Sequence, residues 1–336
     1  IMSQHGNFEW FGHLYLQHGH RVGFTAASDN HLSQPGYSAP LGGSLSQRGG
    51  LGAVLAPSGT TDAIFDAMKS LRAYATSGER IILDFTVNDV AMGQRGPFAR
   101  QRAISETIIG TAPINKVTLI KNDAVLWEQS YLDNDEQKLS KKGTFLLSFS
   151  SAANPYHPND NPRGWRGWEG TLEVHNATLD SIEPLDAGFP QQTANASGAS
   201  ANRIVFSTKT RGDSSSYLLK LSGVQRTTRI DFDLVETLES GGAPPFYRPP
   251  RRIPAESFSL SIKDLQNGEV GHTQLVDGYM DRAALRQVIT DGPREVTISH
   301  TDESDKQGHY YFLRVVQAND AMAWSSPIWI GGHDKR

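Results

Sequence analysis

The sequence predicts an α/β segment over residues 1–79, followed by a large antiparallel β-sandwich over residues 80–336. Before residue 80, short apolar runs and a helix-like apolar periodicity alternate, as is typical of α/β structure. After residue 80, about a dozen short runs alternate apolar and polar residues, and Gly, Asn, Asp and Ser separate them. Many short strands with almost no helical periodicity are typical of an antiparallel sandwich.

The composition bounds the classes of function. At 336 residues the chain has room for two domains, and 38% hydrophobic with 20% charged residues is enough to bury a core. The net charge of -4 is small and both signs are interspersed, so we expect no nucleic-acid partner. No apolar run is long enough to cross a membrane. Because the chain has no cysteine, disulfides, thiolate catalysis and cysteine-ligated metals are excluded.

Two helices and two short strands are expected before residue 80. Glu9–Gln17 predicts a short helix, and the apolar run Val22–Ala27 predicts a buried parallel strand. A second buried strand is expected at Gly52–Ala56. From Thr61 an apolar face recurs at helical spacing until Gly78, the natural C-terminal stop.

The later strands are expected to pair as a sandwich. Two short segments remain open to a helical interpretation, Pro97–Thr107 and Asp281–Val288. The expected strands are Ile81–Asn88, Lys116–Lys121, Val125–Tyr131, Thr144–Ser150, Thr171–His175, Arg203–Thr208, Tyr217–Leu221, Thr228–Val235, Phe258–Ile262, Val296–His300, His309–Val316 and Ala323–Ile330.

A metal site is predicted where the first buried strand ends. Asp29 and His31 are two residues apart, so on an extended backbone their side chains leave the same face. A carboxylate beside an imidazole suits zinc, manganese or iron. Five of the eleven histidines also fall within the first 31 residues. The alternative is an aspartate that ends a strand and caps a turn, with an exposed histidine nearby.

Two irregular stretches stand out among the strands. Asn154–Gly170 contains Tyr156, Trp165 and Trp168, which would either stack on sugars or fasten the loop to the sandwich; we favour the second interpretation. The proline-rich stretch Gly241–Pro254 is interpreted as an irregular connection.

The stretch Gly19–His31 reads GHRVGFTAASDNH and is followed by Pro35-Gly36. It resembles the last metal-binding motif of the polymerase and histidinol phosphatase (PHP) superfamily. Further stretches are similar, in order, to a largely uncharacterised bacterial branch of that superfamily with an additional C-terminal domain. They are Gly52–Ala56, Ser70–Gly78, Arg80–Asn88, Tyr310–Gln317 and Met322–Trp329.

The resemblance implies that residues 1–79 are the C-terminal part of a seven-stranded PHP-type β/α barrel. Such a barrel would hold two or three divalent metal ions, zinc, manganese or iron, and hydrolyse phosphoesters. The resemblance also implies that Asp29 and His31 are the family's final Asp-x-His ligand pair. His5, in Gln4-His5-Gly6, matches a preceding single-histidine ligand.

Three further residues are candidates for the chemistry. The catalytic residue is not identified; Glu9 stands where this branch often has an acid and is one candidate for it. Arg72 and Tyr74 are candidates for substrate binding, and the alternative for Arg72 is a surface position on the helix. The family's opening His-x-His motif and its middle ligands have no counterpart in the chain, and three ligands are too few for the implied cluster. We therefore expect the N-terminal half of the same protein, or a second chain, to complete the barrel.

Two functions from different classes follow. The first is a metal-dependent hydrolase, a phosphoesterase that uses metal-activated water on a small phosphorylated substrate and is active only with the missing N-terminal half. The alternative is a non-catalytic sandwich that binds carbohydrate or protein, or that shields the barrel mouth, beside an incomplete or degenerate PHP-like site. We favour the bacterial periplasm or secretion over the cytoplasm.

Overall fold

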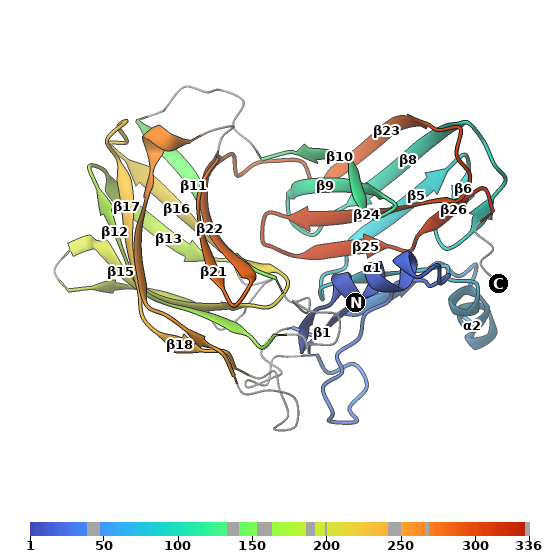
Figure 1. The fold of residues 1–336 in the computed structure, drawn as a ribbon, viewed down its shortest axis with the longest axis horizontal. Helices are drawn as coiled ribbons and strands as arrows, with labels where there is room; N and C mark the ends of the chain where they lie inside the picture. The colour runs from blue at the N-terminus through green and yellow to red at the C-terminus, as the bar shows by residue number, and fades with distance from the viewer. Residues whose placement is uncertain are drawn as a thin grey trace.

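The computed structural model describes residues 1–38, 48–132, 141–152, 163–185, 192–198, 200–240, 250–265 and 269–332. In these ranges the chain is almost entirely β-structure. It has two α-helices, α1 (Glu9–Gln17) and α2 (Thr61–Lys69), and one 3-10 helix, η1 (Ile262–Asp264). Figure 1 shows two β-sandwiches side by side, with α1 and α2 along one of them.

The first sandwich takes its strands from both ends of the described chain. Their bounds are β3 (Leu51–Val54), β4 (Ala73–Thr76), β5 (Ile82–Val87), β6 (Val90–Ala91), β7 (Arg95–Gly96), β8 (Gln101–Ile109), β9 (Ile114–Lys121), β10 (Ala124–Ser130), β23 (Glu295–Glu303), β24 (His309–Gln317), β25 (Met322–Ser325) and β26 (Ile328–Ile330). The larger sheet has the order β10-β9-β24-β25-β4-β3, and β26 joins β24 to β7. The smaller sheet has the order β23-β8-β5-β6, and the two sheets enclose one hydrophobic core.

The second sandwich is formed by the chain between β10 and β23. Its strands are β11 (Lys142–Ser151), β12 (Arg166–His175), β13 (Thr178–Pro184), β14 (Thr193–Ser197), β15 (Ser200–Thr210), β16 (Ser214–Ser222), β17 (Arg229–Leu234), β18 (Thr237–Leu238), β19 (Arg252–Ile253), β20 (Glu256–Ser261), β21 (Glu269–Val276) and β22 (Tyr279–Val288). Two five-stranded sheets, β13-β16-β11-β22-β21 and β14-β15-β12-β17-β20, face each other. Between them Phe149, Phe206 and Phe232 form part of an aromatic core.

The N-terminal residues cover the outer face of the larger sheet of the first sandwich. Leu16 and Phe24 pack there against Phe312 and Trp324. Phe312 points to this outer layer and its neighbour Leu313 to the sandwich core, so β24 is buried on both faces. Burial on both faces explains why β24 reads as the nearly continuous hydrophobic run HYYFLRVV instead of alternating.

The expectation of a β/α-barrel part in residues 1–79 is wrong. A β/α barrel requires each helix to connect parallel neighbouring strands. Here α2 connects β3 and β4, which pair antiparallel, and β4 pairs antiparallel with β25 from the far end of the chain. Strands β3 and β4 therefore extend an antiparallel sheet of the first sandwich, and the residues before them lie over its outer face.

Several local expectations also differ from the structure. Helix α2 ends at Lys69, and the rest of the range expected to be helical contains β4. Pro97–Thr107 and Asp281–Val288, considered as helices, lie largely in strands β8 and β22. In β8 the buried positions, such as Ile104 and Ile108, recur with period two, the signature of a strand with one buried face.

The aromatic loop between β11 and β12 is described from residue 163. Trp165 and Trp168 are 0% and 1% exposed, and Trp168 packs on Phe149 in the sandwich core. The interpretation that these tryptophans fasten the loop is therefore confirmed. Tyr156, and residues 241–249 of the proline-rich stretch, lie outside the described residues.

Candidate metal site

The site is built where two chain segments run parallel. The amide of Ala27 donates to the carbonyl of Met2 at 3.2 Å, and the amide of Gln4 donates to the carbonyl of Ser28 at 3.0 Å. Met2 and Ala26 form a parallel bridge in this ladder. Because parallel segments end on the same side, the residues that follow each of them meet there.

His5, Asp29 and His31 meet at that end of the ladder. One ligand atom from each lies within 4.8 Å of the others. His5 Nε2 is 3.5 Å from Asp29 Oδ2, and His31 Nε2 is 3.2 Å from Asp29 Oδ1. The three residues that the sequence singled out as metal ligands are therefore neighbours in space, although His5 and Asp29 are 24 positions apart.

His5 lies in a tight hairpin between β1 (Met2–Ser3) and β2 (Gly6–Asn7). Its amide donates to Ser3 Oγ at 3.1 Å. Gly6 follows with φ of 131°, a backbone conformation that side chains disfavour. The hairpin thus fixes the backbone on both sides of the His5 imidazole.

Asp29 and His31 do not lie on an extended strand, so the reason first given for their proximity is wrong. Both are left-handed, with φ of 51° and 58°. Between them Asn30 holds the turn: its Nδ2 donates to the carbonyl of Tyr37 at 2.8 Å, and its Oδ1 accepts from the amide of Leu32 at 3.0 Å. The turn places the His31 ring beside the Asp29 carboxylate.

The surroundings of the three side chains suit a cation ligand set. The Asp29 and His31 side chains are 58% and 68% exposed, and that of His5 is 23% exposed, so the cluster is open to solvent on one side. Partial burial lowers the pKa of His5, against the opposing charge of Asp29, and so favours the neutral imidazole that binds metals. Two imidazoles and one carboxylate with an open side are a donor set that fits zinc and related divalent metals.

Glu9, the candidate catalytic acid, is instead held by the fold. Its carboxylate accepts from Trp324 Nε1 at 2.8 Å, and contacts His13 Nε2 at 3.2 Å and Arg314 Nη1 at 3.3 Å. Burial acts to raise the pKa of Glu9, but the His13 hydrogen bond, the Arg314 charge and the Trp324 hydrogen bond outweigh it and leave the pKa below its usual range. These partners tie α1 to β24 and β25.

The two candidate substrate-binding residues differ in burial and in hydrogen bonding. The Tyr74 hydroxyl donates to the carbonyl of Ile81 at 3.0 Å, and the side chain is 6% exposed within the first core. Arg72 is exposed beyond the end of α2. Among the described residues, the structure gathers His5, Asp29 and His31 as a possible metal-ligand group.

Sequence reasoning missed one residue that touches this site. Arg211, in the turn between β15 and β16 of the second sandwich, donates from Nη1 to the backbone carbonyl of His5 at 2.6 Å. The two residues are 206 positions apart. No local pattern signals this contact, because it depends on how the two sandwiches meet.

The fold and site together define a protein of two antiparallel β-sandwiches with an exposed His-Asp-His cluster on an N-terminal layer. A family model described as "Protein of unknown function (DUF3604)" matches residues 8–90. The matched range includes Asp29 and His31, and excludes His5 and the second sandwich.

Uncharacterized chlamydial proteins share a similar segment. The chain is 36% identical over 76 residues to one from Chlamydia pneumoniae and 37% identical over 76 residues to one from Chlamydia trachomatis. Each alignment covers 21% of this chain and 11% of the relative, so the chain spans about a tenth of the length of the curated relatives it matches. No solved structure matches the chain. Within the described residues, no helix is both long and apolar enough to span a membrane.

Proposed function

We propose that this chain carries the metal-binding part of a metal-dependent hydrolase, with His5, Asp29 and His31 as the ligands. The observation that supports the proposal is the convergence of these three side chains within 4.8 Å at the ends of two parallel segments. Three protein ligands with an open side are the arrangement that catalytic zinc sites use.

A bound divalent cation would supply a water of lowered pKa and a Lewis acid for the substrate oxygen. The protein's own residues would hold that cation. His5 contributes a largely enclosed imidazole, and Asp29 a carboxylate between the two rings. His31, on the exposed side of the turn, would be the third ligand. The open side leaves room for water and substrate.

Phosphoester hydrolysis is the reaction we favour, and it rests on the sequence resemblance. A small phosphorylated substrate would approach from the solvent side of Asp29 and His31. We further propose that another polypeptide segment adds ligands and substrate-binding groups. The exposed hydrophobic residues on α1 and α2, among them Phe11, Phe65 and Met68, offer a surface for such a segment.

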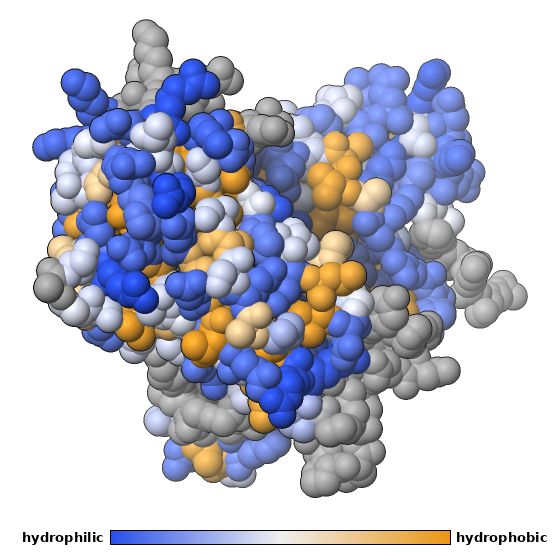
Figure 2. All heavy atoms as spheres, turned by 60° about the vertical axis from the view of Figure 1, so that its left-hand side comes forward, coloured by the Kyte–Doolittle hydropathy of each residue, from blue (hydrophilic) through white to orange (hydrophobic). Residues whose placement is uncertain are grey.

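The alternative function, a non-catalytic binding sandwich, has less support from the geometry. The aromatic surface that suggested carbohydrate binding is absent at Trp165 and Trp168, because both are buried. The second sandwich, turned forward in Figure 2, shows hydrophobic residues interspersed with hydrophilic ones. Its exposed hydrophobic side chains include Leu275 and Met280, which are 70% and 67% exposed and face each other across β21 and β22.

Zinc binding is the direct test. We expect the purified chain to bind one zinc ion in a chelator competition, and Asp29→Ala to abolish that binding. Because alanine fits the left-handed backbone at position 29 less well than aspartate, the free energy of unfolding should fall by about 1–2 kcal/mol. Asp231→Ala is a matched control, because Asp231 also contacts a histidine, His175, at 3.0 Å on the second sandwich. Equal zinc affinity in the wild type and Asp29→Ala would refute the site. Phosphoester turnover would then be screened with zinc, manganese or iron.

A further inference from the structure

Arg211 joins the second sandwich to the hairpin that carries His5. Its side chain is 5% exposed, and Nη1 donates to the carbonyl of His5 at 2.6 Å. Its own carbonyl accepts from the amide of Asn7 at 3.1 Å. One residue of the second sandwich therefore contacts the His5 hairpin through both its side chain and its backbone.

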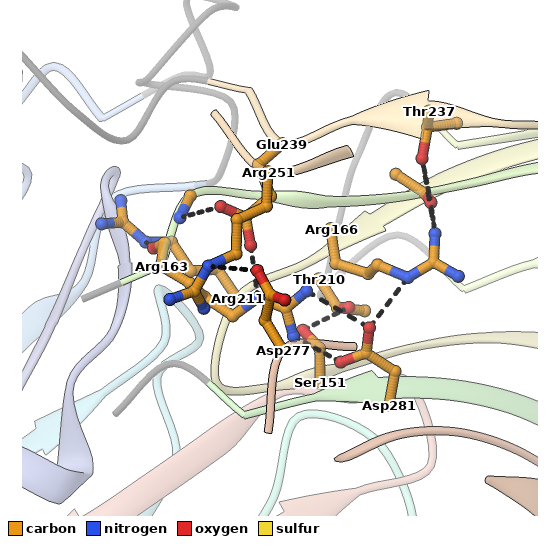
Figure 3. Close-up of polar contacts among 12 residues, drawn as sticks. Ser151, Arg163, Arg166, Thr210, Arg211, Thr237, Glu239, Arg251, Asp277 and Asp281 are labelled. Carbon is orange, nitrogen blue, oxygen red and sulfur yellow. Dashed lines mark hydrogen bonds and ion pairs between the residues drawn. The ribbon is translucent and has the colours of Figure 1, made fainter. Parts of the chain in front are cut away.

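Arg211 is itself held in place by hydrogen bonds within the second sandwich. Its Nε donates to the carbonyl of Arg163 at 2.8 Å, and its amide donates to Asp213 Oδ1 at 2.8 Å. Figure 3 shows Arg211 beside Arg163, which is bound by Asp281 and Glu239. Arg163 Nη1 lies 2.5 Å from Asp281 Oδ1, and Arg163 Nε lies 2.8 Å from Glu239 Oε1.

The hairpin is shaped to receive this arginine. A Cβ atom at Gly6 would lie 2.9 Å from Arg211 Cδ, so a glycine at position 6 lets the arginine stem lie against the backbone. The guanidinium group also lies over the Phe8 ring, 5.1 Å from its centroid. The contact is thus specific in packing as well as in hydrogen bonding.

We propose that Arg211 is a positioning residue of the metal site, which makes the site a composite of the N-terminal layer and the second sandwich. This inference rests on the proposed function. Arg211 acts through His5: it holds the peptide group that carries the imidazole, in the way that outer residues orient the ligands of metal sites. The planar guanidinium suits this role because it donates to the His5 and Arg163 carbonyls at once.

The test is the zinc affinity of a series of Arg211 variants. We expect Arg211→Ala to weaken zinc binding about 10- to 100-fold, and Arg211→Lys to recover part of the loss by donating to one carbonyl. In Arg211→Met, which keeps an unbranched stem but donates no hydrogen bond, the zinc affinity should fall as far as in Arg211→Ala. Arg203→Ala is the matched control, since Arg203 lies on β15 in an exposed ion pair with Glu173.

The outcomes separate this proposal from the proposed function. A folded Arg211→Ala protein with wild-type zinc affinity, or an Arg211→Met protein that recovers zinc affinity as fully as Arg211→Lys, would overturn the positioning role. If the wild type binds no zinc, the proposed function fails, and hydrogen exchange of the Gln4 and Asn7 amides decides the positioning role. Faster exchange in Arg211→Ala, or in Arg211→Lys should the alanine variant not fold, supports it, and unchanged exchange refutes it.

Discussion

Two clusters of charged residues in this protein differ in their exposure to solvent and in the partners of their carboxylates. In the second sandwich, Asp281 is 0% exposed and accepts hydrogen bonds from Arg163 and Arg166 at 2.5–3.2 Å. At the proposed metal site, Asp29 is 58% exposed and lies against two histidines. In the buried cluster the carboxylate oxygens accept hydrogen bonds from the protein itself. In the exposed cluster the side chains remain accessible to a ligand from solvent.

This difference separates a structural role from a ligand-binding role for residues of the same type. A buried charge is retained only with well-placed partners, since its desolvation is costly. Arg163 and Arg166 are matched by Asp281 and Glu239, so the buried cluster is balanced. An exposed cluster contributes little to stability and is free to serve binding.

The largest effect is expected in the buried cluster. Asp281→Asn removes the carboxylate that two buried arginines share, so we expect the free energy of unfolding to fall by about 3–5 kcal/mol. Urea denaturation measures the change. Asp277→Asn is the control: Asp277 is 67% exposed in an ion pair with Arg251, and its loss should cost less than about 1 kcal/mol. Similar losses in both variants would contradict the distinction.

Removing the charge of a buried carboxylate should stabilise the protein where neither carboxylate oxygen is hydrogen-bonded. Glu106 is 1% exposed, and burial raises its pKa from 4.5 to about 8. Between these values the unfolded chain releases a proton that the folded chain keeps, so the free energy of unfolding falls as the pH rises. Glu106→Gln should remove this fall. At pH 8 the substitution should stabilise the protein by a few kcal/mol, because a shift of one pKa unit corresponds to about 1.4 kcal/mol. Parallel pH profiles for the wild type and Glu106→Gln would refute this.

Zinc should stabilise the protein through the exposed cluster. A ligand that binds only the folded chain adds about 2.7 kcal/mol at 100 times its dissociation constant. We expect that gain for the wild type in urea denaturation with zinc, and its loss in Asp29→Ala. The Asp281→Asn protein, where folded, should gain as much as the wild type. Zinc stabilisation of Asp29→Ala would place the metal elsewhere.

The smallest effect is expected at Glu9. Because its carboxylate is bound by Trp324, His13 and Arg314, Glu9→Gln should lower the free energy of unfolding by about 2 kcal/mol. Its zinc affinity should match that of the wild type. A fall in zinc affinity with unchanged stability would return Glu9 to the group of candidate site residues.

Local patterns were most informative where one element interacts mainly with its own neighbours. The helix at Glu9–Gln17 has the expected bounds, and strands occur where period-two alternation is clear, as at Ile82–Val87. The helix begun at Thr61 stops at Lys69 because Ala73–Thr76 pairs with Met322–Ser325. That strand pairing decides the conformation of residues whose own periodicity is helical.

The sequence by itself determined the abundance of strands, the absence of cysteine chemistry, and the choice of His5, Asp29 and His31 as candidate ligands. The tertiary structure decided that those candidate ligands meet through a parallel ladder and a left-handed turn. It also decided that the strands divide between two sandwiches and that Arg211 reaches His5. The physical reason is range: residue patterns report local backbone preference and burial, whereas strand pairing and the meeting of sandwiches depend on contacts between residues far apart in the chain.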